Sequence, residues 1–498
     1  MGNNNFKSTV GQSAGKSIIN EKEIKKGYRI EKDSIGEKEV PIDVYYGIQT
    51  LRAVENFHIT GLNMHPEIVN SLAYIKKACA ITNESVGILD YNIAEAIKKA
   101  CDEILEGKFR NDFIVDPIQG GAGTSLNMNA NEVIANRAIE LLNGKKGDYS
   151  VVNSLDHVNL GQSTNDVIPT AGKMTTIRLL VNLKKELVRL YQALLDKSDE
   201  FKDVIKMART QMQDAVPITL GQEFKAYADA ILRGLNRVDK AVEEMRYVNM
   251  GGTAVGTGIN ADEAYLKNIV PILNQVSGMN FVQANDLIDS TQNLDPFVAV
   301  SGEVKSIAIT LSKMANDLRL MSSGPIAGFG EINLPAKQNG SSIMPGKVNP
   351  VIPEVVNQVA FNVIGNDTTI TLAAEAGQLE LNAFEPIIFY NLFQSIDTLG
   401  FAVRTFVDNC IIGITANKER CKQLVENSVG IITALSPYIG YQKSADLAKR
   451  ALKENRKVRD LILEEKILTE EELNKILNIE NMMKPGHYAK ASNYKVLK

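Results

Sequence analysis

Histidine, cysteine and tryptophan are scarce in this sequence. Its 498 residues include four His, four Cys and no Trp. No two cysteines have the C-x-x-C spacing, and the H-E-x-x-H pattern is absent, so the sequence argues against a zinc site and against a disulfide framework. We expect the four cysteines to be buried, reduced thiols of a cytoplasmic protein.

Long apolar runs and an excess of charge of one sign are missing as well. The 55 basic and 59 acidic residues leave a formal net charge of −4, which gives no electrostatic basis for binding nucleic acid or an anionic membrane. No apolar run reaches the ~18 residues of a membrane span, and the polar start of the chain has no secretory h-region. The patterns G-x-G-x-x-G and G-x-x-x-x-G-K-[ST] are also absent, which disfavours a nucleotide-binding α/β fold.

The sequence does contain strong helical periodicity. Between Asp295-Pro296, a helix-start signal, and Ser322, apolar residues recur at steps of four and three, as on one face of a long helix. Similar apolar seams cover residues 177–194, 231–248 and 385–406. Helices this long need partners along their whole length, so we predict an all-α protein built on a bundle of long helices. Strand patterns are short and confined to residues 39–47 and 111–115.

Four segments between the predicted helices are rich in Ser, Thr, Asn and Gly: residues 119–129, 161–166, 209–214 and 340–350. The first either cradles a small anion, with Thr124 and Asn129 as donors, or is an ordinary turn. In the second, hydroxyls either cap the following helix or help its N-terminus bind a carboxylate. The third is either a solvated loop or a binding loop. The fourth has the composition of a flexible active-site lid, with a plain surface loop as the alternative.

The fourth segment, GSSIMPGKVNP, resembles the signature loop of the fumarase/aspartase superfamily. Four more blocks match that family in the right order along the chain: QGGAGTSLNMNANEVIANRA, GQSTNDVIPT, RTQMQDAVPITLGQEF and GGTAVGTGIN. The resemblance extends from about residue 27 to the end of the chain.

The resemblance implies a fumarase/aspartase-like fold of three domains around a long central helix bundle. We expect a mobile tail at residues 1–26, an N-terminal domain at 27–162, a long-helix domain at 163–418 and a small C-terminal domain at 419–498, in which residues 468–472 form a helix-start pattern. Members of the family form homotetramers. The resemblance therefore also implies a D₂-type assembly with a 20-helix core and with active sites built from loops of three subunits.

The family's reaction removes a proton from the carbon beside a carboxylate and expels a group from the neighbouring carbon, which leaves fumarate. Its intermediate is a doubly charged aci-carboxylate, so donors aimed at that charge carry most of the catalysis. By resemblance, Ser341 is the general base, made acidic by backbone N–H groups and by Lys347. The other implied site residues are Thr124, Ser163, Thr164 and Ser342 for the carboxylate beside the abstracted proton, Lys347 and Asn349 for the other carboxylate, Asn165, Thr210 and Gln211 around the leaving group, and Glu354 in support.

One position separates two branches of the family. Fumarases carry His where this chain has Gln211, and that His pairs with a carboxylate that Glu354 resembles. The pair that helps to handle water is therefore missing here, and an amide is better suited to orient a carboxylate or an ammonium than to relay protons. Residues 355–359 and 373–386 also resemble aspartases, whereas Gly346 is typical of fumarases.

We therefore predict the reversible deamination of L-aspartate to fumarate and ammonia. The expected partner is a small-molecule substrate, without nucleic acid or membrane. The resemblance implies no required cofactor and no metal-ligating site residue, but leaves open an activating divalent cation at a separate site. Two alternatives are fumarate hydration by the same fold and a non-catalytic helical scaffold, against which the intact Ser341, Lys347 and Asn349 argue.

Overall fold

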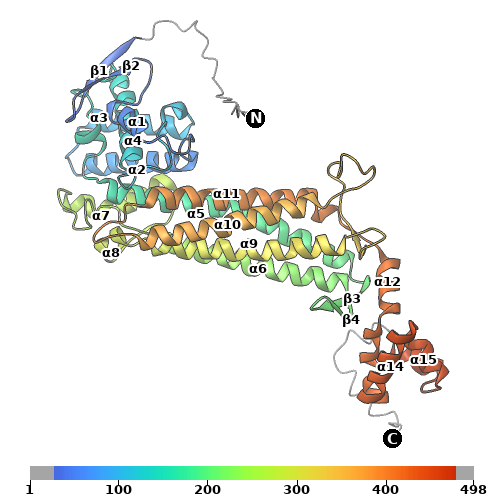
Figure 1. Cartoon of the computed structure of the whole chain (residues 1–498). Coiled ribbons are helices and arrows are strands. Elements are labelled where there is room, and N and C mark those ends of the chain that lie inside the picture. Colours follow the sequence, from blue (N-terminus) through green and yellow to red (C-terminus); the bar gives the residue numbers. More distant parts are fainter. Residues whose placement is uncertain (1–26, 478–498) are drawn as a thin grey trace, which may run out of the picture.

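The computed structural model describes residues 27–477. Three regions follow one another along the chain: a helical N-terminal domain, a long bundle that projects from it, and a small helical unit beyond the other end of the bundle (Figure 1). The tail predicted for residues 1–26 lies outside the described residues, as does the end of the predicted C-terminal domain.

The N-terminal domain packs short helices around an apolar core. Ile68, Leu72, Ile97 and Val133 are shielded from solvent in that core. Its elements are β1 (Tyr28–Lys32), β2 (Glu37–Pro41), α1 (Ile48–Asn56), α2 (Pro66–Ser85), α3 (Tyr91–Leu105), a 3₁₀ turn (Arg110–Asp112), α4 (Thr124–Leu141) and a π-helical turn (Ser154–Val158). β1 and β2 form an antiparallel hairpin.

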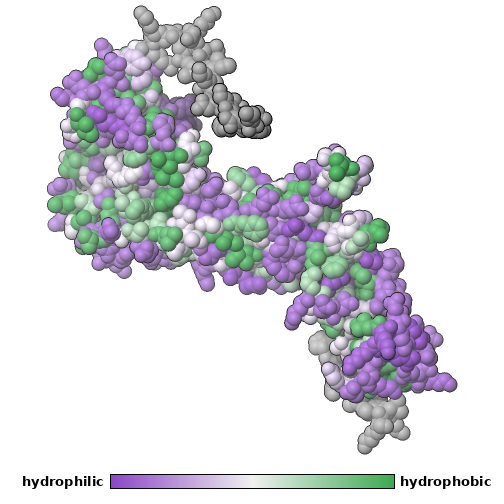
Figure 2. Space-filling model, in the orientation of Figure 1, coloured by the Kyte–Doolittle hydropathy of each residue, from purple (hydrophilic) through white to green (hydrophobic). Residues whose placement is uncertain are grey.

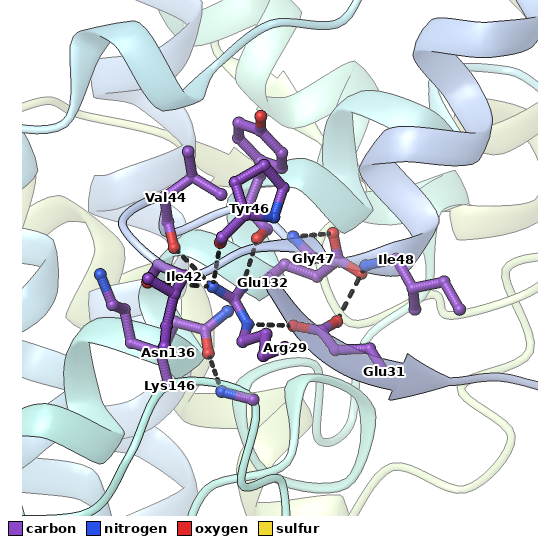
Figure 3. Close-up of polar contacts among 12 residues, drawn as sticks. Arg29, Glu31, Ile42, Val44, Tyr46, Gly47, Ile48, Glu132, Asn136 and Lys146 are labelled. Atoms are coloured by element: carbon purple, nitrogen blue, oxygen red, sulfur yellow. Dashed lines mark hydrogen bonds and ion pairs between the residues drawn. The ribbon is translucent and has the colours of Figure 1, made fainter. Parts of the chain in front are cut away.

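Two buried carboxylates fix the start of α1 in this domain. Glu132 of α4 accepts hydrogen bonds from N–H groups within residues 47–50 and from the Thr50 hydroxyl, at 2.6–3.1 Å. Glu31 accepts a bond from the N–H of residue 48 and is paired with Arg29, which also holds backbone carbonyls of the preceding segment (Figure 3). The carboxylates thus satisfy the exposed N–H groups and the positive end of the helix.

Five long helices make up the bundle: α5 (Thr164–Glu200), α6 (Leu220–Glu244), α9 (Asp295–Met321), α10 (Val351–Glu375) and α11 (Glu385–Asn409). They alternate in direction, so that α5, α9 and α11 start near the N-terminal domain and α6 and α10 run back toward it (Figure 1). We call the end at which α5 begins the head end, and the end at which it finishes the far end.

Short elements cover both ends of the bundle. At the head end lie α7 (Glu263–Ser277), α8 (Leu287–Gln292) and the parallel pair β5 (Tyr247–Val248) and β6 (Val282–Gln283). At the far end lie the antiparallel hairpin of β3 (Ile205–Thr210) and β4 (Gln213–Thr219), and the pair β7 (Ile332–Asn333) and β8 (Thr415–Ala416).

The C-terminal unit has a core of its own. It contains α12 (Lys418–Asn427), the 3₁₀ turn Val429–Ala434, α13 (Ser436–Ile439), α14 (Tyr441–Glu454), α15 (Val458–Glu464) and α16 (Glu470–Ile476). Met207 of β3 is buried in the same apolar cluster as Leu435, Leu447 and Leu461. The β3–β4 hairpin therefore packs with the C-terminal unit as well as with the bundle.

Most of the predicted helices are confirmed. The seam at 295–322 is α9, and the seams at 177–194 and 385–406 lie in α5 and α11. The apolar residues that form the seam of α9 are all buried: Val300, Val304, Ile307, Leu311, Met314, Leu318 and Met321. The seam at 231–248 overshoots, because α6 ends at Glu244 and Val248 belongs to β5. The helix start predicted at 468–472 is also confirmed, with Thr469 as the capping residue of α16.

The strand predictions fare worse. Residues 39–47 are a strand only up to Pro41, and the strand at 111–115 is wrong. The alternation there arises because Phe113 and Val115 point into the core from an irregular segment after a 3₁₀ turn. The fifth long helix, α10, and the β3–β4 hairpin were not predicted at all.

Candidate active site

Two helix N-termini meet at the head end of the bundle. α4 begins at Thr124 and α5 begins at Thr164. The approach is so close that a Cβ atom on Gly123, the residue before α4, would lie 2.9 Å from Cγ2 of Ile168 in α5. Converging N-termini present unpaired N–H groups and two positive dipole ends, an arrangement that favours a carboxylate.

Hydrogen bonds within the chain orient the hydroxyls at this point. The Asn127 amide donates to Oγ1 of Thr164 at 3.3 Å and to Oδ1 of Asn159 at 3.2 Å. Because the Thr164 oxygen accepts this bond, its own O–H remains available as a donor. Thr124, at the surface, donates to the carbonyl of Gly121 at 2.7 Å.

A buried lysine, Lys76, is bonded to the same network of amide side chains. Nζ of Lys76 donates to Oδ1 of Asn159 and to Oε1 of Gln162, both at 2.9 Å. Burial lowers the pKa of Lys76 to about 8, since a charged ammonium is costly to desolvate.

Ser163 caps α5, one of the two roles expected for residues 161–166, and its own O–H is left as a donor for the other role. Its hydroxyl accepts a bond from the N–H of Asn165 at 3.2 Å, while Asp166 accepts one from the N–H of Ser163 at 3.0 Å. Asp166 is buried and also accepts bonds from the N–H groups of Gly251 and Thr253, both at 3.1 Å. Burial raises the pKa of Asp166 to about 6 despite these donors.

Two side chains of this end already have partners in the chain. The Asn165 amide donates to the carbonyl of Ala254 at 2.7 Å. The donor role expected for Asn129 is wrong, because Asn129 is buried and bonded to the backbone of Asp112 and Ile114.

The other predicted residues lie at the far end of the bundle. Thr210 and Gln211 stand at the tip of the β3–β4 hairpin, where both turn residues, Gln211 and Met212, have positive φ angles of 53° and 66°. Such a turn normally carries Gly or Asn, because other residues lose roughly 1–2 kcal/mol each in the left-handed region. The Gln211 side chain is exposed and has no hydrogen-bond partner within residues 27–477.

The signature loop, residues 340–350, is held by bonds to its own backbone. Oγ of Ser341 accepts hydrogen bonds from the N–H groups of Ile343 at 3.2 Å and Met344 at 3.0 Å. At the neck of the loop, the N–H of Gly340 donates to the carbonyl of Lys347 at 2.9 Å, and the Asn349 amide donates to the carbonyl of Gly340 at 2.6 Å.

The rest of the loop is open to solvent. Ser342 and Lys347 are exposed, and neither side chain has a hydrogen-bond or ion-pair partner in the described part of the chain. Ile343 is 84% exposed, so the apolar residues that first made this segment unusual do not pack against their own chain. Glu354 follows in the first turn of α10.

The two sets of predicted residues are therefore not brought together within one chain. α5 separates them, and its 37 residues span ~55 Å at 1.5 Å per residue. The head end holds Thr124, Ser163, Thr164 and Asn165; the far end holds Thr210, Gln211, Ser341, Ser342, Lys347, Asn349 and Glu354.

Several supporting residues were missed from the sequence. Ser163-x-x-Asp166 is a capping pattern that could have predicted the Asp166 contact. Lys76 lies among Leu72, Ala73 and Cys79 on an apolar helix face, and that was a usable signal for a buried cation. The hydrogen bond that Nη1 of Arg209 donates to Oε1 of Glu331, at 2.8 Å, joins residues 122 positions apart and has no local signal.

Comparison with known proteins identifies the family of the chain. A family model for lyases matches residues 36–365, and a model of the fumarase C C-terminus matches residues 431–484. The chain belongs to the fumarase/aspartase superfamily of lyases. Within the superfamily it is 55% identical to aspartate ammonia-lyase of Bacillus subtilis (strain 168) over 461 residues, which cover 93% of this chain and 97% of that protein. It is 53% identical to aspartate ammonia-lyase of Helicobacter pylori (strain J99) over 93% of this chain and 99% of that one.

Solved structures of the superfamily share the fold. A fumarate lyase:delta crystallin from Brucella melitensis bound to cobalt matches with a TM-score of 0.90 and 48% identity, over 92% of this chain and all of that one. A class II fumarase from Schistosoma mansoni matches with a TM-score of 0.90 and 36% identity over the same shares. The predicted all-α superfamily fold is confirmed.

Metal-ligating clusters and membrane-spanning helices are absent from the described residues. Within residues 27–477, no three His, Cys, Asp or Glu side chains are grouped so that they could hold a metal ion. None of the helices in that range is both long and apolar enough to cross a bilayer.

Proposed function

We propose that this chain catalyses the reversible deamination of L-aspartate to fumarate and ammonia. Its similarity to aspartate ammonia-lyases of several bacteria over nearly the whole chain supports this reaction. The observation that carries the mechanism is local: two backbone N–H groups of the signature loop point at the oxygen of Ser341.

Ser341 is the proposed general base. Hydrogen bonds to the charged form of a group favour that form, so the N–H groups of Ile343 and Met344 lower the cost of the Ser341 alkoxide. The alkoxide takes the proton from the carbon beside one substrate carboxylate, and the electron pair of that C–H bond moves into the carboxylate to give the aci-carboxylate. When the pair returns to form the double bond, the C–N bond breaks, and the nitrogen, which is an ammonium in the substrate, leaves as ammonia with the electrons of that bond. Ser341 then gives the abstracted proton to solvent, which restores the base.

The remaining residues bind the substrate in this proposal. Hydroxyls and helix N-termini at Thr124, Ser163 and Thr164, with Ser342, hold the carboxylate that becomes the aci-carboxylate, where hydrogen bonds strengthen as charge develops. The other assigned contacts are Lys347 and Asn349 for the second carboxylate, Asn165, Thr210 and Gln211 around the amine, and Glu354 in support of the signature loop.

The site is proposed to form between copies of the chain. Because ~55 Å separates the two sets of residues along α5, one chain cannot bring both to one substrate. Five long helices per chain suit a 20-helix core of a D₂ homotetramer whose sites take loops from three copies, so that far-end residues of other copies lie beside each head end.

The surface of the bundle supports this assembly. Phe361, Leu372 and Phe401 are about 60% exposed on α10 and α11, and hydrophobic patches are visible along the bundle in Figure 2. Exposed apolar patches on a soluble chain often mark a protein–protein interface. We therefore propose that further copies of the chain bury these side chains. A cytoplasmic location is part of the proposal, because four free, buried cysteines suit a reducing compartment.

The direct test measures fumarate by its ultraviolet absorbance with L-aspartate in one reaction and L-malate in another. The proposal expects fumarate from aspartate alone. Fumarate from malate alone would favour hydration, the alternative to which Gly346 points. No product from either substrate, together with thermal stabilisation by aspartate, would favour the scaffold.

A further inference from the structure

Lys76, on α2, is a cation in the core of the N-terminal domain. Its side chain is shielded from solvent, and Nζ donates to the neutral amide oxygens of Asn159 and Gln162, each at 2.9 Å. A buried cation held by neutral groups pays a cost of desolvation that a carboxylate partner would offset. Stability alone therefore does not account for Lys76, because an apolar side chain of similar size would avoid that cost.

Both acceptors of Lys76 lie in the turn that leads into α5. Gln162 directly precedes Ser163, the capping residue of α5. The Asn159 amide donates to the carbonyl of Gln162 at 3.2 Å, and the Gln162 amide donates to two backbone carbonyls of the same turn at 3.0 and 3.1 Å. Lys76 thus bonds this turn to α2 immediately before the N-terminus of α5.

A second set of hydrogen bonds reaches Thr164. Oδ1 of Asn159 accepts bonds from Lys76 and also from the amides of Asn127 and Asn131 on α4, both at 3.2 Å. The same Asn127 nitrogen donates to Oγ1 of Thr164 at 3.3 Å, and an amide has two N–H groups, one for each of these oxygens. The hydrogen bonds therefore run from Lys76 through Asn159 and Asn127 to the hydroxyl of Thr164.

Lys76 makes these bonds at full strength only in its charged form. A hydrogen bond from an ammonium is roughly twice as strong as one from a neutral donor. Burial lowers the pKa of Lys76 to about 8, so the ammonium is present at neutral pH and loses its proton in mildly alkaline solution.

Four other ionisable groups surround Lys76. Cys79 on α2, Cys101 on α3 and Asp166 on α5 act on its charge, and the hydroxyl of Tyr265 on α7 donates to Sγ of Cys79 at 3.3 Å. Burial raises the pKa of Cys79 to about 12 and also raises the pKa values of Cys101 and Tyr265, while that of Asp166 is about 6. Among these five groups, Lys76 is the one that changes its charge near pH 8.

We propose that Lys76 is a positioning residue, whose ammonium holds the turn before α5 so that the cap at Ser163 and the hydroxyl of Thr164 meet the substrate carboxylate. The inference rests on the proposed function, which assigns these two hydroxyls to the carboxylate that gains charge. Lys76 does not touch the substrate in this account; it acts through Asn159 and Gln162.

The first test replaces the ammonium by an apolar side chain of similar length. In Lys76→Met, kcat for aspartate falls roughly tenfold, because contacts to the developing charge are strongest in the transition state, and KM changes less than about threefold. The thermal midpoint stays near that of the unaltered chain or rises, since the buried charge is gone. The matched control is Lys77→Met, the same exchange one residue along α2, where the lysine pairs with Asp102 at 2.6 Å near the surface; its kcat stays unchanged.

The pH profile supplies a readout that a merely structural role would not change. The ratio of kcat in the unaltered chain to kcat in Lys76→Met isolates the lysine, because all other titrating groups are common to both proteins. This ratio falls from roughly tenfold at about pH 7 to roughly threefold or less at about pH 9, as the ammonium loses its proton.

Asn159→Asp tests the same idea with the lysine in place. The new carboxylate accepts the bond from Nζ as an opposite charge, which raises the pKa of Lys76. The alkaline decline of kcat therefore moves to higher pH, by about one unit. This measurement does not depend on Lys76→Met folding correctly.

The outcomes separate the inference from the function on which it rests. A kcat of Lys76→Met equal to that of Lys77→Met, or a kcat ratio that is constant between about pH 7 and 9, overturns the inference. An alkaline decline that stays at the same pH in Asn159→Asp does so as well. An unaltered chain that makes no fumarate from aspartate overturns the proposed function itself.

Discussion

The two ends of the bundle are built in opposite ways. At the head end, Ser163 caps a helix and Thr164 takes part in a buried network based on Lys76. At the far end, Gln211 and Lys347 are exposed, and the turn that carries Gln211 is in an unfavourable backbone conformation. The head-end side chains are bonded within the chain, whereas Gln211 and Lys347 have no side-chain partner in the described residues.

The difference separates two tasks of the proposed reaction. A carboxylate that gains charge is best met by donors that do not have to reorganise, and the head end offers two fixed helix N-termini. The base and the leaving-group contacts must admit substrate and release product, and such tasks fall to loops of low local stability.

The largest expected effect comes from removing the base at the far end. Ser341→Ala should lower kcat for aspartate by on the order of 10³-fold, as expected for the loss of a positioned general base, while the thermal midpoint changes little because the loop is exposed. Steady-state kinetics and a thermal melt test this. A variant with near-normal kcat would remove Ser341 from the mechanism.

The neck of the signature loop should be the next most sensitive point. A Cβ on Gly340 would lie 2.2 Å from the Lys347 carbonyl oxygen, whereas one on Gly346, at a φ of 81°, meets nothing within 4 Å and adds only the roughly 1–2 kcal/mol of left-handed strain. Gly340→Ala should therefore distort the Ser341 loop and lower kcat on the order of 10²-fold, and Gly346→Ala should retain most of the activity. Equal activity of the two variants would contradict the described neck.

At the head end, the sharpest test is the pH dependence of stability. Burial raises the pKa of Glu132 from 4.5 to about 7, so between these pH values the folded chain holds a proton that the unfolded chain has lost. Stability of the unaltered chain therefore falls as pH rises through this window, by roughly 3 kcal/mol relative to Glu132→Gln, which does not titrate.

Thermal melts of both proteins from pH 4.5 to 7.5 measure that difference. Glu95→Gln, a change on the exposed face of α3, serves as the control and should follow the unaltered chain. A gap between the unaltered chain and Glu132→Gln that is constant with pH would contradict the described burial.

The smallest effect concerns the strained turn. Met212→Gly replaces a residue with φ of 66° by the residue that suits this region, and should stabilise the hairpin by about 1 kcal/mol. Slower amide exchange at residues 208–214 would show it. Faster exchange would mean that the Met212 side chain, 58% exposed, holds the turn.

The sequence predicts some elements of the fold and not others. Apolar spacing was enough for α5, α9 and α11, because a helix that packs along its whole length must repeat its contacts every three to four residues. α10 was not predicted, because polar residues such as Asn357, Asn366 and Asp367 occupy buried positions and interrupt its apolar spacing. The β3–β4 hairpin escaped because its turn contains neither Gly nor Asn.

The candidate site was also predicted only in part. Motif resemblance singled out Ser341, Thr164 and Gln211, but it contained nothing about Arg209 meeting Glu331 or Lys76 lying under Asn159. Those contacts join distant segments, and their existence depends on the tertiary fold. The separation of the two residue sets became visible only with the length of α5.

The central claim is that each site combines the head end of one copy with far-end residues of other copies. The most direct measurement mixes two variants, Ser341→Ala and the double variant Thr124→Val/Thr164→Val, dissociates and reassembles them together, and assays fumarate formation from aspartate. Random mixing puts an unaltered head end beside an unaltered far end in roughly a quarter of the sites. The account predicts recovery of about that share of normal activity; a reassembled mixture no more active than the separate variants would contradict it.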